Sequence, residues 1–270
     1  MPELPEVETV VAGLKKTVLG KIIQKVDLLY PKIVKSDLFQ FRLKLPGTKI
    51  EEIQRRGKNI LFSLSDHHTL LAHLGMTGHM FFFHQSSKPD KHDVAVFKFI
   101  EGELHFHDIR KFGKLALLSQ EVEKSATQKL GPEPLQISFK NFTQLFRRHK
   151  RMIKPVLLDQ SFLAGIGNIY ADETLFEARI HPKMRTHKLD DEALKRLYNG
   201  IRKTLKKAIK TGGSSVVNYV DVNGQKGHFQ IYHKVYGKAG EPCPRCRAKI
   251  KRILVGQRST HFCPKCQKRR

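Results

Sequence analysis

The chain has 270 residues, with 50 Lys and Arg against 25 Asp and Glu, so its formal net charge is +25. Hydrophobic residues make up 40% of it, which excludes a disordered basic tail. The excess charge favours a polyanionic partner, most commonly nucleic acid, over a surface that is basic only for solubility. We expect a location in the cytoplasm, because no stretch of about 18 apolar residues predicts a membrane span and the acidic start lacks a signal-peptide pattern.

The first predicted element is an amphipathic helix over residues 5–19. Its apolar positions follow the i, i+3, i+4 spacing of a buried helix face. Pro5 suits the first helical position, Glu6 and Glu8 suit the positive end of the helix dipole, and Gly20 is a typical stop signal. This helix accounts for the acidic start, except for Pro2 and Glu3, which precede it.

Short strands are predicted between residues 21 and 118. VAVFKF (94–99) and ELHFHD (103–108) alternate apolar and polar residues around a tight Glu-Gly turn. KIEEIQ and NILFSL flank the turn RRGK (55–58), and TLLAHL (69–74) is a further strand. Many short strands at close spacing predict a β-sandwich or barrel-like domain.

A Pro/Gly hinge, LGPEPL (130–135), marks a predicted domain boundary. Helical patterns follow at 138–149, 152–159, 168–180 and 189–211. A long polar loop, GGSSVVNYVDVNGQKG (212–227), comes next, and such loops in compact proteins are usually functional. The order of elements therefore predicts an α+β protein of two domains.

The chain has four cysteines, in two CxxC pairs near the C-terminus: Cys243 with Cys246, and Cys263 with Cys266. Four thiolates at this spacing predict a closed, tetrahedral zinc site, which leaves no open position for catalysis. We therefore expect one structural Zn²⁺ holding a small β-hairpin. The loop of that hairpin is predicted to present Arg252 and Arg258 to phosphate.

Taken together, these motifs resemble the formamidopyrimidine-DNA glycosylase family. The resemblance runs from Pro2 to the second CxxC. Its elements are PELPEVE, RRGK, HLGMTG (73–78), DIRKFG (108–113), LGPEPL, GIGNIYADE (165–173), VYGKAGEPC (235–243) and QRSTHFCPKC (257–266). The resemblance implies an N-terminal β-sandwich with flanking helices over residues 1–130. It also implies a helix–two-turn–helix domain over 131–230, with 212–227 as a lesion-covering loop, and a zinc finger over 231–270.

The resemblance also implies that Pro2, freed by removal of Met1, attacks C1′ of the damaged nucleotide and forms a Schiff base. An α-amino group has a pKa near 7.7–8.0, so it is a readier nucleophile at neutral pH than a lysine. In the family, Glu3 helps to open the deoxyribose, Lys58 matches the proton donor of β-elimination, and Arg258 matches the δ-elimination residue. The alternative is structural: Pro2 and Glu3 would only precede a helix, and Lys58 and Arg258 would be solvated surface groups.

A glycosylase must flip its target base out of the duplex and fill the gap. By motif match, Met76, Arg110 and Phe112 fill that gap, and the guanidinium of Arg110 suits the O2 and N3 acceptors of an orphaned cytosine. Met76 and Phe112 would ordinarily lie in a core. Their position beside Gly75, Gly78 and Gly113 instead predicts exposed turns.

Phosphate contacts are implied at His92, Lys150 and Asn168, with Arg55 and Lys154 as weaker candidates. Asn168 lies at the predicted start of a helix, where free N–H groups favour phosphate. In the loop 212–227, Ser215, Val216 and Tyr219 are candidates to hold the base. The chain departs from the family pattern at Val94, where a second histidine is frequent, and at His233 and Lys234, before VYG.

We therefore predict a monomeric base-excision repair enzyme that excises 8-oxoguanine and formamidopyrimidines from duplex DNA and cleaves abasic sites, in the cytoplasm and at the nucleoid of a bacterial cell. One alternative is an endonuclease VIII-type glycosylase for oxidised pyrimidines. The other is a zinc-finger protein that binds damaged DNA without cleaving it. The sequence PELPE and the complete set Met76, Arg110 and Phe112 favour the first interpretation over the endonuclease VIII type. The presence of Pro2, Glu3, Lys58 and Arg258 argues against a protein that only binds DNA.

Overall fold

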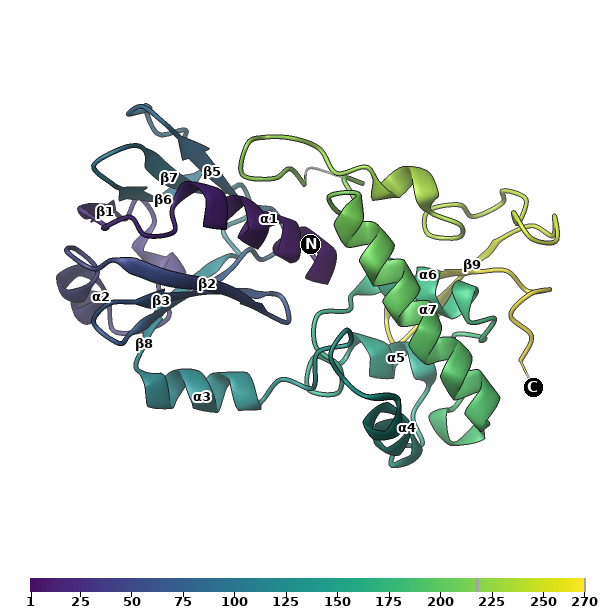
Figure 1. Ribbon diagram of the computed structural model, residues 1–270. Coiled ribbons are helices and arrows are strands. Elements are labelled where there is room, and N and C mark those ends of the chain that lie inside the picture. Colours follow the sequence, from purple (N-terminus) through teal and green to yellow (C-terminus); the bar gives the residue numbers. More distant parts are fainter. Residues whose placement is uncertain (217–218, 270) are drawn as a thin grey trace. The chain divides into compact units, whose positions relative to one another are not determined.

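The computed structural model describes residues 1–216 and 219–269, so Val217 and Asn218 of the predicted loop lie outside the described residues. The chain divides into two compact units (Figure 1). Unit 1 comprises residues 1–129 and 211–228, and unit 2 comprises 130–210 and 229–270. The α+β, two-domain class predicted from the sequence is confirmed. Among the described residues, no helix has the length and apolar character needed to cross a membrane.

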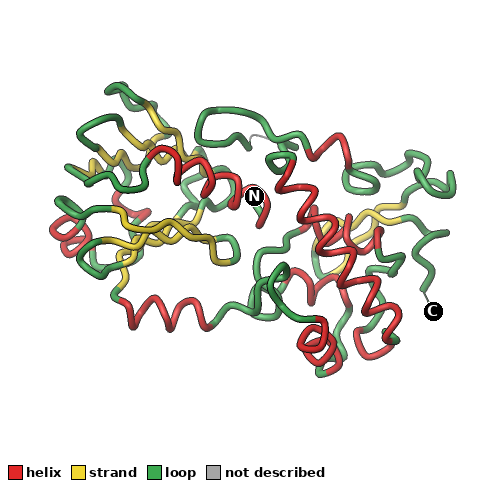
Figure 2. The backbone as a smooth tube through the Cα atoms, viewed as in Figure 1, coloured by secondary structure: helices red, strands yellow, loops and turns green. Residues whose placement is uncertain are grey.

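Unit 1 contains two antiparallel four-stranded sheets, with strand orders β1-β6-β7-β5 and β2-β3-β4-β8 (Figure 2). The first sheet is formed by β1 (Lys25–Asp27), β5 (Gly78–Phe83), β6 (Asp93–Lys98) and β7 (Glu103–Asp108). The second is formed by β2 (Ile50–Arg56), β3 (Asn59–Leu64), β4 (Thr69–His73) and β8 (Lys114–Leu118). The helices of unit 1 are α1 (Leu4–Thr17), η1 (Pro31–Ile33), α2 (Leu38–Lys44) and α3 (Gln120–Gln128).

One hydrophobic core joins both sheets of unit 1 to α1. Val7 and Leu14 of α1, Phe62 of β3 and Phe106 of β7 all belong to it. Tyr219 and Val222, from the segment that returns to unit 1 after a long excursion, complete it. The alternation of apolar and polar residues noted in the sequence thus builds the predicted sandwich.

Unit 2 contains four α-helices and the hairpin that carries the cysteines. Its elements are α4 (Phe139–Arg147), α5 (Ile153–Leu158), α6 (Asn168–Glu177), η2 (Thr186–Lys188), α7 (Asp191–Lys210), η3 (Phe229–Tyr232), β9 (Lys251–Val255) and β10 (Arg258–Phe262). Strands β9 and β10 pair antiparallel, with Arg258 opposite Val255. Gly256 and Gln257 form the two-residue turn, both with positive φ, as expected for a tight hairpin.

The structure contains several elements that the sequence patterns do not predict, among them β1, β8 and the helix α2 within the stretch interpreted as strands. Helix α3 and strand β5 are two further examples. Helix α3 has a Ser119 cap but no buried residue, so it lacks the apolar periodicity by which helices are recognised. Strand β5 begins at Gly78, inside the segment interpreted as a turn, and its run of three phenylalanines hides the period of two.

The position of segment 211–228 follows from its contacts. It belongs to unit 1, whereas the three-range division of the sequence joins it to the helical residues 131–210. Its contacts with the start of α1, described below, explain this grouping. The three-range division itself stays a prediction.

Candidate active site and nucleic-acid interface

The start of α1 places two buried carboxylates at the N-terminus. Glu3 is the N-cap residue, and its N–H donates to Glu6 Oε2 at 2.8 Å. The two side chains form a capping box, and Glu3 and Glu6 are 3% and 2% exposed. Pro2 is buried beside them, while Met1 is half exposed. The sequence interpretation of Glu6 as dipole chemistry is therefore incomplete, because the side chain is a buried acceptor.

The N-terminal amine of unit 1 has an unusual electrostatic environment. Burial lowers the pKa of the amine at Met1 below its usual value. Glu3 and Glu6 raise that pKa, whereas the positive charges of Lys58 and Arg110 lower it further. Unit 1 thus brings the predicted residues Glu3, Lys58 and Arg110 within electrostatic reach of the N-terminus.

The RRGK turn between β2 and β3 fixes Lys58. Gly57 adopts φ +60°, and the Arg55 side chain donates to its carbonyl at 2.9 Å. Arg55 also pairs with Glu8 at 2.6 Å and is nearly buried, so it supports the turn and is engaged within the protein. Lys58 itself is 7% exposed. Near it, burial and the charges of Lys58 and Lys114 lower the pKa of His73 to about 4, which keeps that imidazole neutral.

Met76, Arg110 and Phe112 lie on two adjoining turns of unit 1. Met76 is 42% exposed and Phe112 is 52% exposed, so the prediction of exposed turns is confirmed for both. The guanidinium carbon of Arg110 lies 4.8 Å from the centre of the Phe112 ring, in cation–π contact. A side chain at Gly75 would collide with the Phe112 backbone, so glycine permits the close approach of the turns.

Asp108, which the sequence interpretation missed, ties these two turns together. Its buried carboxylate accepts the Thr77 hydroxyl at 2.6 Å and the Gly113 N–H at 2.7 Å. Its own N–H donates to the carbonyl of His92 at 2.9 Å, which places the predicted phosphate ligand His92 beside the same turns. The available signal was its position at the head of the DIRKFG motif, where an aspartate is suited to accept backbone N–H groups.

Segment 211–228 is anchored on α1 of unit 1. The Ser214 N–H donates to Glu6 Oε1 at 2.7 Å, and the Tyr219 hydroxyl donates to the Glu6 carbonyl at 3.1 Å. Tyr219 is buried, and burial raises its pKa, so the phenol stays protonated. The Ser215 hydroxyl donates to the Tyr219 carbonyl, and Val216 is 46% exposed. Of the three candidates for holding a base, Val216 alone therefore presents an exposed side chain, and Tyr219 serves the core.

In unit 2, the predicted phosphate ligands lie in different environments. Lys150 is exposed. The Asn168 side chain, at the first position of α6, donates to the Ser259 carbonyl of the hairpin at 3.1 Å. Its Oδ1 atom is buried without a hydrogen-bond partner among the described residues. Asn168 thus joins a helix N-terminus to the hairpin strand.

The candidacy of Lys154 as a phosphate contact is contradicted by the structure. Its ammonium is fully buried in unit 2 and donates to Asp172 at 2.6 Å, to the Thr260 hydroxyl at 2.8 Å and to the Ser259 carbonyl at 3.0 Å. These three acceptors use all three of its N–H donors. The second Asp172 oxygen accepts the His261 N–H at 2.8 Å, so the buried pair fastens the hairpin to the helices.

Glu173 is a second buried acid of the GIGNIYADE motif that the sequence interpretation missed. Its carboxylate accepts the backbone N–H groups of Lys234, Val235 and Tyr236, at 2.8–3.0 Å. Burial raises the pKa of Glu173, while these hydrogen bonds oppose the rise. Two adjacent acids in an otherwise buried helix were the signal available from the sequence.

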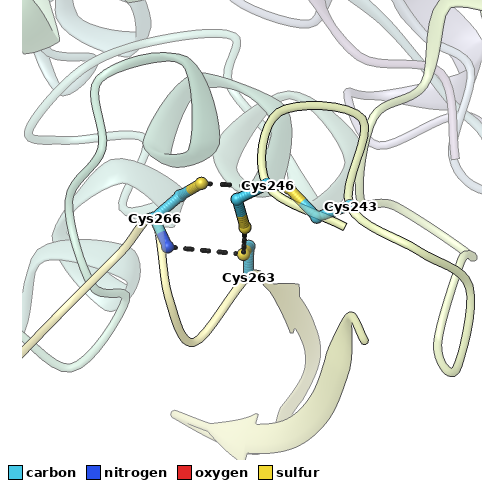
Figure 3. Close-up of side chains that lie close together, drawn as sticks. All are labelled: Cys243, Cys246, Cys263 and Cys266. Atoms are coloured by element: carbon cyan, nitrogen blue, oxygen red, sulfur yellow. Dashed lines mark hydrogen bonds between the residues drawn. The ribbon is translucent and has the colours of Figure 1, made fainter. Parts of the chain in front are cut away.

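The four cysteines converge in unit 2 as their spacing predicts (Figure 3). Their sulfur atoms all lie within 4.8 Å of one another, with 3.9 Å between Cys243 and Cys266 and 3.4 Å between Cys246 and Cys263. Tetrahedral zinc with four thiolates at about 2.3 Å requires sulfur separations of roughly 3.8 Å. The donor set and its spacing therefore fit one structural Zn²⁺.

The hairpin presents its two arginines differently. Arg258 is exposed directly after the two-residue turn. Arg252 lies within β9, not in the loop, and its Nε donates across the pair to the Ser259 hydroxyl at 2.6 Å. The expectation that the hairpin loop presents both arginines is therefore wrong for Arg252.

Comparison with known proteins extends over the whole chain. Family models match as the N-terminal domain of formamidopyrimidine-DNA glycosylase (residues 1–115), its H2TH domain (130–219) and the zinc finger found in FPG and IleRS (240–269). Formamidopyrimidine-DNA glycosylase of Solibacter usitatus is 45% identical over 272 residues, and that of Ligilactobacillus salivarius is 43% identical over 272. The first alignment covers 100% of both chains and the second 99% of both.

Solved structures of the Lactococcus lactis enzyme are similar throughout. A mutant in complex with DNA containing Fapy-dG has a TM-score of 0.93 at 40% identity, covering 99% of this chain and 100% of that one. A complex with DNA containing an abasic site has a TM-score of 0.92 at 41% identity, covering 98% and 99%. The geometry of both units and these full-length similarities lead to one conclusion: the chain belongs to the formamidopyrimidine-DNA glycosylase family.

Proposed function

We propose that Pro2, after removal of Met1, is the nucleophile of a DNA glycosylase and AP lyase that excises oxidised purines. The observation that carries this proposal is the N-terminus of unit 1, where Pro2 is buried beside Glu3 and where burial and the charges of Lys58 and Arg110 lower the pKa of the terminal amine, carried by Met1. We expect the same surroundings to act on the Pro2 amine once Met1 is removed. A lowered pKa leaves more of an amine neutral, and only the neutral amine attacks carbon. Membership of the family supports the same reaction, because relatives named formamidopyrimidine-DNA glycosylase align with this chain over their full length.

The chemistry follows from these groups. The Pro2 nitrogen forms a bond to C1′ as the bond from C1′ to the damaged base breaks. The base leaves with the bonding pair and takes up the proton that the Pro2 nitrogen releases. Glu3 donates a proton to the ring oxygen, so that the sugar opens and an iminium remains. Loss of a C2′ proton then expels the 3′ phosphate by β-elimination, and a second elimination expels the 5′ phosphate. Lys58 neutralises the 3′ phosphate and donates a proton to it as it leaves. Arg258 orients the leaving 5′ phosphate, because a guanidinium is a poor proton donor.

The exposed turns of unit 1 carry side chains that can fill the gap left in the duplex by a flipped base. Met76 and Phe112 are apolar groups that wedge into the gap left by a flipped base. The guanidinium of Arg110 supplies donors to an unpaired cytosine, which selects damage derived from guanine. Asp108 holds the two turns at the spacing that this insertion requires.

The remaining contacts are to the DNA backbone. His92 in unit 1 and Lys150 in unit 2 supply donors to phosphate. Asn168 is the third proposed phosphate contact, and its side-chain amide also donates to the Ser259 carbonyl of the hairpin. The structural zinc, when bound, fixes the hairpin and hence the position of Arg258.

Substrate choice separates this proposal from its two alternatives. Relatives named for formamidopyrimidine favour oxidised purines, although one solved complex of the Lactococcus lactis enzyme contains an oxidised pyrimidine. Incision of duplexes with 8-oxoguanine or an oxidised pyrimidine, opposite each normal base, distinguishes the enzyme classes. We expect fastest incision of 8-oxoguanine opposite cytosine. Binding without incision of any of these duplexes would support the zinc-finger binder.

Borohydride trapping tests the nucleophile. The wild-type protein should form a covalent adduct with DNA containing 8-oxoguanine, and N-terminal sequencing of that protein should begin at Pro2. Pro2→Gly and a preparation that retains Met1 should both lose the adduct while still binding a duplex with a tetrahydrofuran abasic analogue. An equal yield of adduct from protein that retains Met1 would overturn the role of Pro2.

We also propose that the protein acts in the cytoplasm, at the nucleoid. The relatives that it matches come from bacteria, in which the chromosome is the substrate available to a repair enzyme. A fluorescent C-terminal fusion should overlap stained chromosomal DNA.

A further inference from the structure

Two segments of unit 2 form a short antiparallel ladder before α5. The Ile153 N–H donates to the Met184 carbonyl at 2.8 Å, and the Thr186 N–H donates to the Arg151 carbonyl at 3.0 Å. Met152 and Arg185 form a β-bridge between these bonds. The side chains around residues 150–152 and 183–185 are therefore presented from a fixed backbone.

A cavity of about 370 Å³ opens beside this ladder. Five of its lining residues are cations, and none is an acid: Lys150, Arg151, Lys183, Arg185 and Arg269. The other two are Met152 and Pro155. We refer to these seven residues as the cationic cavity.

Most of this positive charge is uncompensated. Arg151 pairs with Asp159 at 2.8 Å. Within residues 1–216 and 219–269, no carboxylate lies at ion-pair distance from Lys150, Lys183 or Arg269. The positive charge also affects the neighbouring His181. Burial lowers the pKa of His181, and the charges of Arg269 and Lys183 lower it further.

The cationic cavity adjoins the turn that presents Arg258. Pro155 lines the cavity, and a Cβ atom added to Gly256 would lie 3.0 Å from its Cγ. Gly256 is two residues from Arg258 on the same hairpin. A strand of DNA whose phosphate contacts Arg258 therefore passes close to a further concentration of positive charge on the same unit.

We propose that the cationic cavity binds a backbone phosphate of the DNA, through Lys183, Arg185 and Arg269 in addition to Lys150. The proposal rests on the function proposed above and names a contact outside the motif residues. A phosphodiester matches the cavity because it is anionic and small, and because several of the lining cations lack an internal partner. A solvated basic face has the same composition but no defined phosphate.

The salt dependence of binding tests this site. Lys183→Ala/Arg269→Ala should make the slope of log K against log salt less steep by about 0.9, the value for one lost phosphate contact. Relative to 1 M salt, this change corresponds to an affinity about eightfold weaker at 0.1 M salt. The probe is a duplex carrying a tetrahydrofuran abasic analogue. Lys195→Ala/Lys206→Ala, which removes the same charge from the exposed face of α7, is the matched control and should leave the slope unchanged. Equal slopes for the two double variants would overturn the proposal.

Replacement of single phosphates identifies the partner. A neutral methylphosphonate placed at successive positions of each strand should reveal one position that weakens wild-type binding but not binding by Lys183→Ala/Arg269→Ala. The absence of any such position would also overturn the proposal. Borohydride trapping of both variants separates this outcome from failure of the proposed chemistry, because the yield of adduct at saturating protein should equal that of the wild type.

Discussion

Glu6 and Ser214 are 208 positions apart in the sequence, yet Glu6 Oε1 accepts the Ser214 N–H at 2.7 Å. The other Glu6 oxygen accepts the Glu3 N–H at 2.8 Å, so one carboxylate holds both the N-terminus and segment 211–228. Both partners are backbone donors, and a carboxylate supplies acceptors to each. The geometry of the proposed nucleophile and that of the segment are therefore set by the same side chain.

Substitution of this carboxylate should be costly. Glu6→Gln replaces one acceptor with an N–H that opposes a buried backbone N–H, and we expect a loss of about 1–3 kcal/mol in the free energy of unfolding. Urea denaturation measures the loss, and limited proteolysis should show earlier cleavage within 211–228. Glu51→Gln, on the exposed face of β2, is the control and should change neither. Equal stability of the two variants would contradict the dual role of Glu6.

The buried pair of Lys154 and Asp172 gives a second prediction. Lys154→Met alone leaves a buried carboxylate without its counter-charge, so unfolding should become easier by about 3–5 kcal/mol. Lys154→Met/Asp172→Leu removes both charges and should recover part of that loss. Urea denaturation of wild type and all variants, with Asp172→Leu completing the cycle, provides the coupling energy. A double variant no more stable than either single variant would show that the pair is not the relevant interaction.

The histidine beside Lys58 predicts a pH dependence of stability. The pKa of His73 is lowered to about 4 in the folded protein, against about 6.5 when unfolded. Between these values the unfolded chain binds a proton that the folded chain does not, so stability is complete above pH 6.5 and falls toward pH 4. His73→Gln should reduce the slope of this part of the profile, as measured by urea denaturation at pH 4–7, while His233, whose pKa is also lowered to about 4, continues to contribute. An unchanged difference between pH 7 and pH 4.5 in that variant would contradict the assignment.

Loss of one cysteine ligand should lower both the zinc content of the protein and its affinity for DNA. Wild-type protein should contain one zinc per chain by elemental analysis, and Cys246→Ser should contain much less, because four thiolates hold the ion. The variant should lose affinity for a tetrahydrofuran-containing duplex, since the hairpin that carries Arg258 loses its support. Cys246→Ser with normal zinc and normal affinity would show that the cluster does not organise the hairpin.

The two hairpin arginines should behave differently. Arg258→Ala should slow the second elimination and raise the share of β-elimination product, because Arg258 is exposed after the turn. Arg252→Ala should leave the products unchanged, because that side chain is engaged with Ser259 at 2.6 Å. Gel separation of the two products from abasic DNA measures the ratio. The same ratio for both variants would remove Arg258 from the elimination step.

The sequence predicts the elements that follow a local pattern. It does not predict the side chains whose partners lie far away in the sequence. Period-two alternation predicted β6 and β7, and CxxC spacing predicted the cysteine cluster, because each is a local signal. Asp108, Glu173 and the burial of Lys154 were missed, since their partners lie on other elements and a charged residue has no intrinsic mark of burial. Arg252 was misplaced by a few residues, because the hairpin turn occupies only Gly256 and Gln257.

The membership of Tyr219 and Val222 in the core of unit 1 has a consequence for biosynthesis. A ribosome that has made residues 1–129 has produced every strand of the sandwich but not the side chains that finish its interior. The apolar surface that Tyr219 and Val222 cover therefore stays exposed until synthesis has passed through the helices of unit 2 and reached residue 222. Premature termination between these points should therefore yield an aggregation-prone fragment rather than a stable sandwich.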